Sequence, residues 1–270
     1  MNKTFKYKKG MSMVELLIVV TIMGLLLAAV LSGVKLLEQA KLNNVLADMQ
    51  RYKVAFKGYE EYYRYKPGDD PNAGARWGTE CAVTAAACSG NGNNSIYPSP
   101  MGSYGGLNES IVAWKHLALS KFIDYEIRQY DPSVKPTIGR GKDIPESGIT
   151  PHAGYVFAGS LREDNVARTG YLFNRTTVLM LAKHRGGFAT NNTGSGEFVI
   201  PTEGALTGSQ MIYLSNKTGG NGVPKDGILR GVDGHDNGGQ YKCWSDYTGL
   251  SYNDKLGDEK VCMVAFHVDV

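Results

Sequence analysis

The sequence predicts an α+β protein in which a long N-terminal helix packs on the antiparallel β-sheet of a disulfide-containing head. Three observations predict this class. An apolar run near the N-terminus continues into a segment with one-sided helical periodicity, and β-rich runs bounded by Gly, Asn and Pro fill much of the rest. The four cysteines are even in number in a chain that also carries an export-like segment, which favours disulfides over metal-binding or catalytic thiols.

The charge of the chain is concentrated at its N-terminus. The 270 residues are 42% hydrophobic and 20% charged, which fits a folded protein rather than a disordered one. The formal net charge is +3, but four lysines (Lys3, Lys6, Lys8 and Lys9) lie in the first ten residues. Without that stretch, 25 of the 29 basic side chains stand against 26 acidic ones, a net charge of −1. The remainder therefore shows no general attraction for nucleic acid or anionic lipid.

The apolar segment that follows the basic leader has the length of a membrane span. Met11 to Leu31 is 21 residues, and at about 1.5 Å per residue it matches the roughly 30 Å of bilayer hydrocarbon. The leader orients such a helix with the head outside the cytoplasm. A secretory signal peptide cut near Ala28 to Gly33 and a plain membrane anchor are the alternatives. Neither explains Glu15, an ionisable residue inside the run, whose partner we expect to come from outside its own helix.

Gly10, Met11 and Glu15, ahead of the apolar helix, resemble the prepilin N-terminal motif of type IV pilins and type II secretion pseudopilins. The resemblance implies that prepilin peptidase cuts between Gly10 and Met11 and N-methylates Met11. It also implies that Glu15 pairs with the Met11 amine of a neighbouring subunit, since a buried carboxylate needs a buried cation. Met11 stands where phenylalanine is more usual, and Ser32-Gly33 stands where many pilins carry proline.

The resemblance also predicts a pilin-like lollipop with four parts. These are a basic leader (1–10), a transmembrane and assembly half of the helix (11–33), an amphipathic half (34–66) and a β-rich head (67–270). Apolar residues at alternating spacings of three and four mark the amphipathic half as a stripe that packs under a sheet. Its members are Leu42, Val45, Met49, Tyr52, Phe56, Tyr59 and Tyr63.

Four cysteines permit three disulfide pairings. We favour Cys81–Cys88 with Cys243–Cys262, because short loops close at the lowest entropic cost. Zinc is the competing interpretation, but no C-x-x-C pair is present and no histidine lies at ligand spacing from a cysteine.

Within the head, residues 108–123 read as a short amphipathic helix capped by Asn108. Its expected buried positions are Ile111, Trp114, Leu117 and Phe122, and His116 lies on it. Strands are predicted at 155–158, 171–173 with 176–181, 198–200, 211–214 and 261–270. In the last strand, alternate residues from Cys262 to Val270 should share one face.

The sequence contains no convincing catalytic constellation, because its five histidines are scattered and no phosphate-loop or dinucleotide motif occurs. Asp233, Asp236 and Asn237 offer hard oxygen ligands on a glycine-rich loop, so calcium is an alternative there to an ordinary solvated turn. No other cofactor is expected.

These features together predict a structural filament subunit rather than an enzyme. The expected partners are prepilin peptidase, other pilin or pseudopilin subunits and the inner-membrane assembly platform, with no nucleic acid. The subunit would sit in a bacterial inner membrane as a single-pass protein and then in a cell-surface or periplasmic filament. A secretion pseudopilin, a filament-tip adhesin and a membrane-anchored enzyme are the alternatives.

Overall fold

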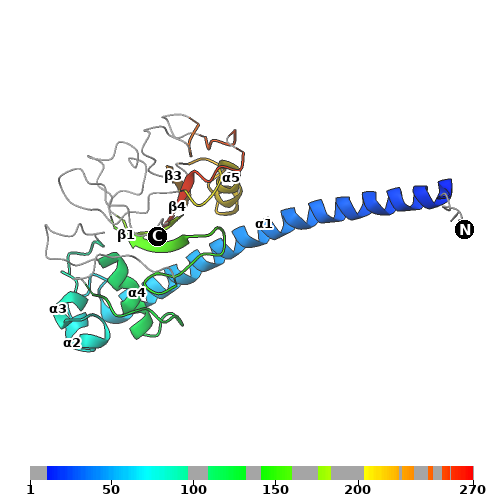
Figure 1. Cartoon of the computed structure of the whole chain (residues 1–270). Helices are drawn as coiled ribbons and strands as arrows, with labels where there is room; N and C mark the ends of the chain where they lie inside the picture. Colours follow the sequence, from blue (N-terminus) through cyan, green and yellow to red (C-terminus); the bar gives the residue numbers. More distant parts are fainter. Residues whose placement is uncertain are drawn as a thin grey trace, which may run out of the picture. The chain divides into compact units, whose positions relative to one another are not determined.

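The computed structural model describes residues 11–96, 109–131, 141–159, 176–183, 204–224, 227–233, 243–245, 251–255 and 257–269. The chain divides into two compact units, Met1–Asn43 and Asn44–Val270. Helix α1 (Met13–Tyr63) contributes to both (Figure 1). Its predicted span of Met11 to Lys66 is thus close to the observed one. The helix ends at Tyr63 because Arg64 adopts the left-handed φ of 66° ahead of Pro67.

The second unit contains a four-stranded antiparallel sheet of order β1-β2-β4-β3. Its strands are β1 (Ala153–Ala158), β2 (Val178–Lys183), β3 (Leu229–Asp233) and β4 (Cys262–His267). The C-terminal strand β4 lies inside the sheet, where Val264 pairs with Leu181 of β2 and with Gly231 of β3. The long helix, the antiparallel sheet and the disulfides confirm the predicted α+β class.

The later part of α1 packs on one face of this sheet. Five residues of the predicted stripe are buried in this part of the helix, namely Val45, Met49, Tyr52, Phe56 and Tyr59, and two of them contact β1. The Tyr52 ring lies 5.2 Å from that of Tyr155, and the Phe56 ring lies 4.9 Å from that of Phe157.

The other face of the sheet is buried as well. Its apolar cluster is formed by Ala158, Val178, Met180, Ala182, Val232, Met263 and Ala265. All six residues of β4 are consequently buried. The sequence predicted that alternate residues from Cys262 share one face, and the structure adds that Met263 and Ala265 between them are buried as well. Both faces of a strand inside a doubly covered sheet are apolar.

Helix α4 (Glu109–Leu119) covers β1 next to α1. The Trp114 ring contacts both neighbours, at 4.9 Å from the Tyr52 ring and 4.5 Å from the Phe157 ring. Eight of the eleven residues of α4 are buried, so this helix is enclosed rather than amphipathic, whereas Phe122 beyond it is only half-buried. The proposed cap, Asn108, lies outside the described residues.

Residues 67–96 form a small lobe, which we call the α2–α3 lobe. It contains α2 (Ala73–Trp77), a short 3₁₀ turn, η1 (Gly78–Glu80), and α3 (Ala85–Cys88). Its apolar residues pack with Val112 of α4, which places α4 between the lobe and the sheet (Figure 1).

One predicted strand is wrong. Residues 211–214 lie in helix α5 (Gly208–Lys217), which a capping box begins. The Thr207 side chain accepts the Gln210 N–H, and the Gln210 side chain accepts the Thr207 N–H. Strand β3 was not predicted, and the strands proposed at 171–173 and 198–200 lie outside the described residues.

A buried ion pair joins the end of α1 to the end of the sheet. Lys66, which is 6% exposed, donates to Thr177 Oγ1 at 2.9 Å and to Asp269 Oδ2 at 3.3 Å. Asp269 Oδ2 also accepts the Thr177 backbone N–H at 2.6 Å. The chain segments after α1, before β2 and after β4 therefore meet at one charge pair.

Replacing Asp269 with alanine should destabilise the protein, because Lys66 would remain buried without its counter-charge. We expect the free energy of unfolding to fall on the order of 3 kcal/mol, measured by urea denaturation of the full chain in detergent. Glu60→Ala is the control, since its ion pair with Lys57 is half-exposed and should change stability by about 0.5 kcal/mol or less. Equal losses in the two variants would contradict a special role for the buried pair.

Candidate functional site

The N-terminal turn of α1 holds the Glu15 carboxylate at the Ser12 backbone N–H, as in one half of a capping box. The Ser12 backbone N–H donates to Glu15 Oε2 at 2.8 Å, and Ser12 Oγ accepts the Val14 N–H at 3.3 Å. These bonds satisfy two of the N–H groups that the first turn of a helix leaves without intrahelical acceptors.

This arrangement corrects one expectation from the sequence. We expected Glu15 to have no polar neighbour within its own helix, but Ser12 supplies one. The sequence argument considered side chains and overlooked the backbone donors of the first turn. The signal was present, because Ser12-x-x-Glu15 is the capping-box pattern.

The first unit exposes its apolar surface. The large hydrophobic side chains from Met11 to Leu37 are at least 40% exposed. The most apolar window of α1 has a mean hydropathy of 2.8, and none of it is buried within the structure. By length and composition this helix could cross a membrane, although a signal sequence near an N-terminus passes the same test. Gly10, the other half of the predicted cleavage site, lies outside the described residues.

Both disulfides join the cysteines that the sequence pairs. Cys81 is bonded to Cys88, and Cys243 is bonded to Cys262. All four side chains are fully buried. From their loop lengths, the crosslinks stabilise the fold by about 2.5 and about 3 kcal/mol in the chain-entropy model.

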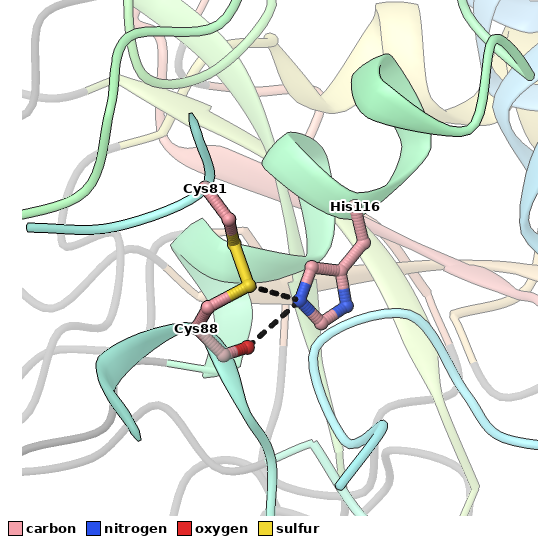
Figure 2. Close-up of side chains that lie close together, drawn as sticks. All are labelled: Cys81, Cys88 and His116. Carbon is pink, nitrogen blue, oxygen red and sulfur yellow. Dashed lines mark hydrogen bonds between the residues drawn. A yellow bond between two sulfur atoms is a disulfide. The ribbon is translucent and has the colours of Figure 1, made fainter. Parts of the chain in front are cut away.

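His116 of α4 lies against the Cys81–Cys88 disulfide (Figure 2). It also connects α4 to the loop after α1 and to α3. Its Nδ1 accepts the Gly68 N–H at 2.9 Å. Its Nε2 lies 2.9 Å from the Cys88 carbonyl oxygen and 3.6 Å from Cys88 Sγ. Because Nδ1 must accept from Gly68, the ring proton is on Nε2, which donates to the Cys88 carbonyl.

Gly68 can approach His116 only because it has no side chain. Its φ of +92° lies in the left-handed region, and a Cβ there would come within 2.3 Å of the Glu109 carbonyl oxygen. The loop after α1 is thus in close contact with the first turn of α4.

A polar network surrounds the histidine. Tyr59 OH donates to Asp70 Oδ2 at 2.8 Å, and Arg76 Nη1 donates to the same oxygen at 2.7 Å. Burial and the neighbouring Asp70 carboxylate raise the pKa of Tyr59, so its phenol keeps the proton that it donates. The Tyr59 ring is stacked on that of His116 at 5.8 Å.

Burial lowers the pKa of His116 from 6.5 to about 4. The Cys88 carbonyl and Asp70 oppose this shift, and Arg76 adds to it. The imidazole is therefore neutral near pH 7.

Cys81, Cys88 and His116 have the proximity of a metal site, with ligand atoms within 4.8 Å of one another. The chemistry does not fit a metal ion. Both sulfur atoms are used in the disulfide, and the Nε2 that faces them carries a proton, so neither thiolates nor a ring lone pair is offered. Within the described part of the chain, this cluster is a structural connection and not a metal centre.

The proposed calcium residues are not brought together by any described contact. Asp233 ends β3, while Asp236 and Asn237 lie outside the described residues. Calcium at this loop stays a prediction.

The comparisons with known proteins bear on the N-terminal segment. Residues 5–31 match the family model of the prokaryotic N-terminal methylation motif, which is the signature of prepilins and pseudopilins. The match covers one tenth of the chain. No curated protein and no solved structure matches the chain. The motif supports a pilin-like or pseudopilin-like substrate of prepilin peptidase, and with the apolar helix it fits a membrane-anchored precursor.

Replacing His116 with phenylalanine should destabilise the head. The change leaves the buried Gly68 N–H and Cys88 carbonyl without partners, so we expect the free energy of unfolding to fall by about 2–4 kcal/mol, measured by urea denaturation at neutral pH. His116→Gln is the matched control, because its amide oxygen can accept and its NH₂ can donate. Equal free energies of unfolding in the two variants would show that the hydrogen bonds of His116 do not stabilise the head.

Proposed function

We propose that the chain is a structural subunit of a type IV pilus-like or pseudopilus filament. Prepilin peptidase cuts it between Gly10 and Met11 and methylates the new amine, and the subunit then assembles through its N-terminal helix. The observation that carries this proposal is the methylation motif at residues 5–31, together with Gly10, Met11 and Glu15 within it.

The exposed apolar helix supports the proposal energetically. Burying a large aliphatic side chain stabilises a structure by roughly 1.5–3 kcal/mol, and α1 presents such side chains on all sides up to Leu37. Lipid would cover them before assembly, and the helices of neighbouring subunits would cover them in a filament.

The hydrogen bond between Ser12 and Glu15 is compatible with pairing between subunits. Only Oε2 of Glu15 accepts the Ser12 N–H, and an ionised carboxylate can accept at both oxygens. The second oxygen could receive the Met11 amine of a neighbour. In a water-poor helix bundle, that charge would otherwise lack a counter-ion.

The alternatives concern the kind of filament. A type II secretion pseudopilin would share the processing and the helix, and an adhesin at a filament tip would add a binding surface on the head. We prefer the broader proposal, a subunit of a pilus-like or pseudopilus filament, because the motif is common to both classes of subunit. The proposed role is structural rather than enzymatic, in a subunit that moves from the inner membrane to a cell-surface or periplasmic filament.

The mature protein purified from native membranes should begin with methylated Met11. Cleavage by prepilin peptidase removes the ten-residue leader, so N-terminal sequencing and intact mass should give the same start. Deleting the peptidase should leave the full leader in place. Cleavage after Ala28 or beyond would identify a secreted head and exclude the filament model.

Glu15→Ala should separate processing from assembly. The variant keeps Gly10 and Met11, so we expect cleavage and methylation to continue while recovery of the subunit in sheared filaments falls at least about tenfold, the effect of roughly 1.4 kcal/mol per contact. Glu38→Gln removes an exposed carboxylate from the same helix and should assemble normally. Wild-type filament yield from Glu15→Ala would exclude the proposed role.

A further inference from the structure

The α2–α3 lobe is attached to α4 by one titratable side chain. His116 accepts from Gly68 at the start of the lobe and donates to Cys88 at the end of α3. The lobe has other attachments: Val83 N–H donates to the Tyr130 carbonyl, and Tyr130 N–H donates to the Cys81 carbonyl. Of these contacts, those of His116 change with pH in the mildly acidic range.

A second proton on His116 would have to bind Nδ1. That nitrogen accepts the Gly68 N–H at 2.9 Å and lies 3.4 Å from the hydroxyl oxygen of Tyr59, whose proton is donated to Asp70. A proton on Nδ1 would point at the Gly68 N–H, so that shorter hydrogen bond would be lost. The imidazolium would also be fully buried, since His116 is 0% exposed.

The neighbouring charged groups do not compensate for that proton. Asp70, from the loop after α1, already accepts from Tyr59 of α1, from Arg76 of α2 and from the Asn72 N–H. The Arg76 guanidinium repels an imidazolium, and the α3 cysteine is held in a disulfide that does not titrate. No described element packed against His116 offers an uncommitted carboxylate.

We propose that His116 is an acid-sensitive latch: its protonation releases the α2–α3 lobe from α4 while the four-stranded sheet stays folded. The direction in which pH shifts the equilibrium between the closed and open states follows from the linkage between protonation and opening. The pKa of His116 is lower in the closed state than in an open one, so a fall in pH from 6.5 towards 4 favours the open state. Above that window the imidazole is neutral in both states, and the latch stays closed.

The sheet has its own crosslink, which provides an internal reference. Cys243–Cys262 ties β4 to a segment beside β3. There the Tyr252 hydroxyl oxygen accepts the Gly231 backbone N–H of β3 at 2.9 Å. Burial raises the pKa of Tyr252 to about 12, so this contact does not change in acid. Both disulfides are fully buried, and a reductant can reach either one only after local opening.

The test is selective reduction of the full-length chain in detergent with a phosphine, which reduces disulfides in acid as well as at neutral pH. Reduced cysteines are alkylated and assigned by peptide mass. Between about pH 7.5 and about pH 4.5, we expect the rate for Cys81–Cys88 relative to Cys243–Cys262 to rise by at least about tenfold and by up to about a hundredfold. The ratio removes the pH dependence of the phosphine itself.

His116→Gln keeps an acceptor and a donor without a titrating group, so its ratio should not change with pH. Parallel reduction of both disulfides in acid would mean global unfolding and would overturn the proposal, as would an unchanged ratio in the wild type. If His116→Gln does not fold, amide hydrogen exchange of the wild type decides. Loss of protection in residues 67–96 ahead of β2 and β4 supports the latch, and simultaneous loss overturns it.

Discussion

The packing of α1 aromatic side chains against the sheet is the contact on which the rest of the head depends. Tyr52 and Phe56 lie under β1, where they meet Tyr155 and Phe157. A fully buried side chain of this size stabilises the fold by roughly 1.5–3 kcal/mol, and edge-to-face ring contacts add to that. These rings also build the next layer, because Trp114 of α4 fits against both Tyr52 and Phe157.

The same helix connects this core to the polar network. One turn after Phe56, Tyr59 stacks on His116 and donates to Asp70. The position of α4, fixed by Trp114 against the sheet, therefore also fixes His116 two residues further along. A single helix register places the apolar core and the lobe attachment together, so a shift in α1 would disturb both.

Regular elements with strong periodicity could be predicted from the sequence, and contacts between distant segments could not. The stripe of α1 has a period that only a helix satisfies, and its burial follows. The segment 211–214, Met-Ile-Tyr-Leu, has high β-propensity. It is nevertheless helical, because the Thr207–Gln210 capping box before it begins α5. Strand β3 contains Gly231, a poor strand residue, because the Tyr252 ring lies within 2.4 Å of where a Cβ would be.

The candidate sites also divide into those that a local sequence pattern predicts and those that depend on contacts between distant segments. Gly10, Met11 and Glu15 are close in sequence, so the local pattern suffices to propose them, and the family model covers the same segment. The sequence-local cysteine pairing was favoured by loop entropy. The role of His116 depends on Gly68 and Cys88, which lie 48 and 28 residues away. No spacing rule connects such positions, and only the folded chain brings them together.

For the filament that we propose, the edges of the sheet favour assembly through the N-terminal helix over strand addition. An open edge strand offers unpaired N–H and C=O groups to another chain. At Gly231 of β3, the Tyr252 hydroxyl accepts the N–H and the Trp244 indole donates to the carbonyl, both at 2.9 Å. At β1, Tyr155 N–H donates to the Pro145 carbonyl at 3.1 Å. A neighbour adding a strand would have to displace these groups, whereas the apolar helix up to Leu37 has no such bonds to break and gains the burial of its side chains.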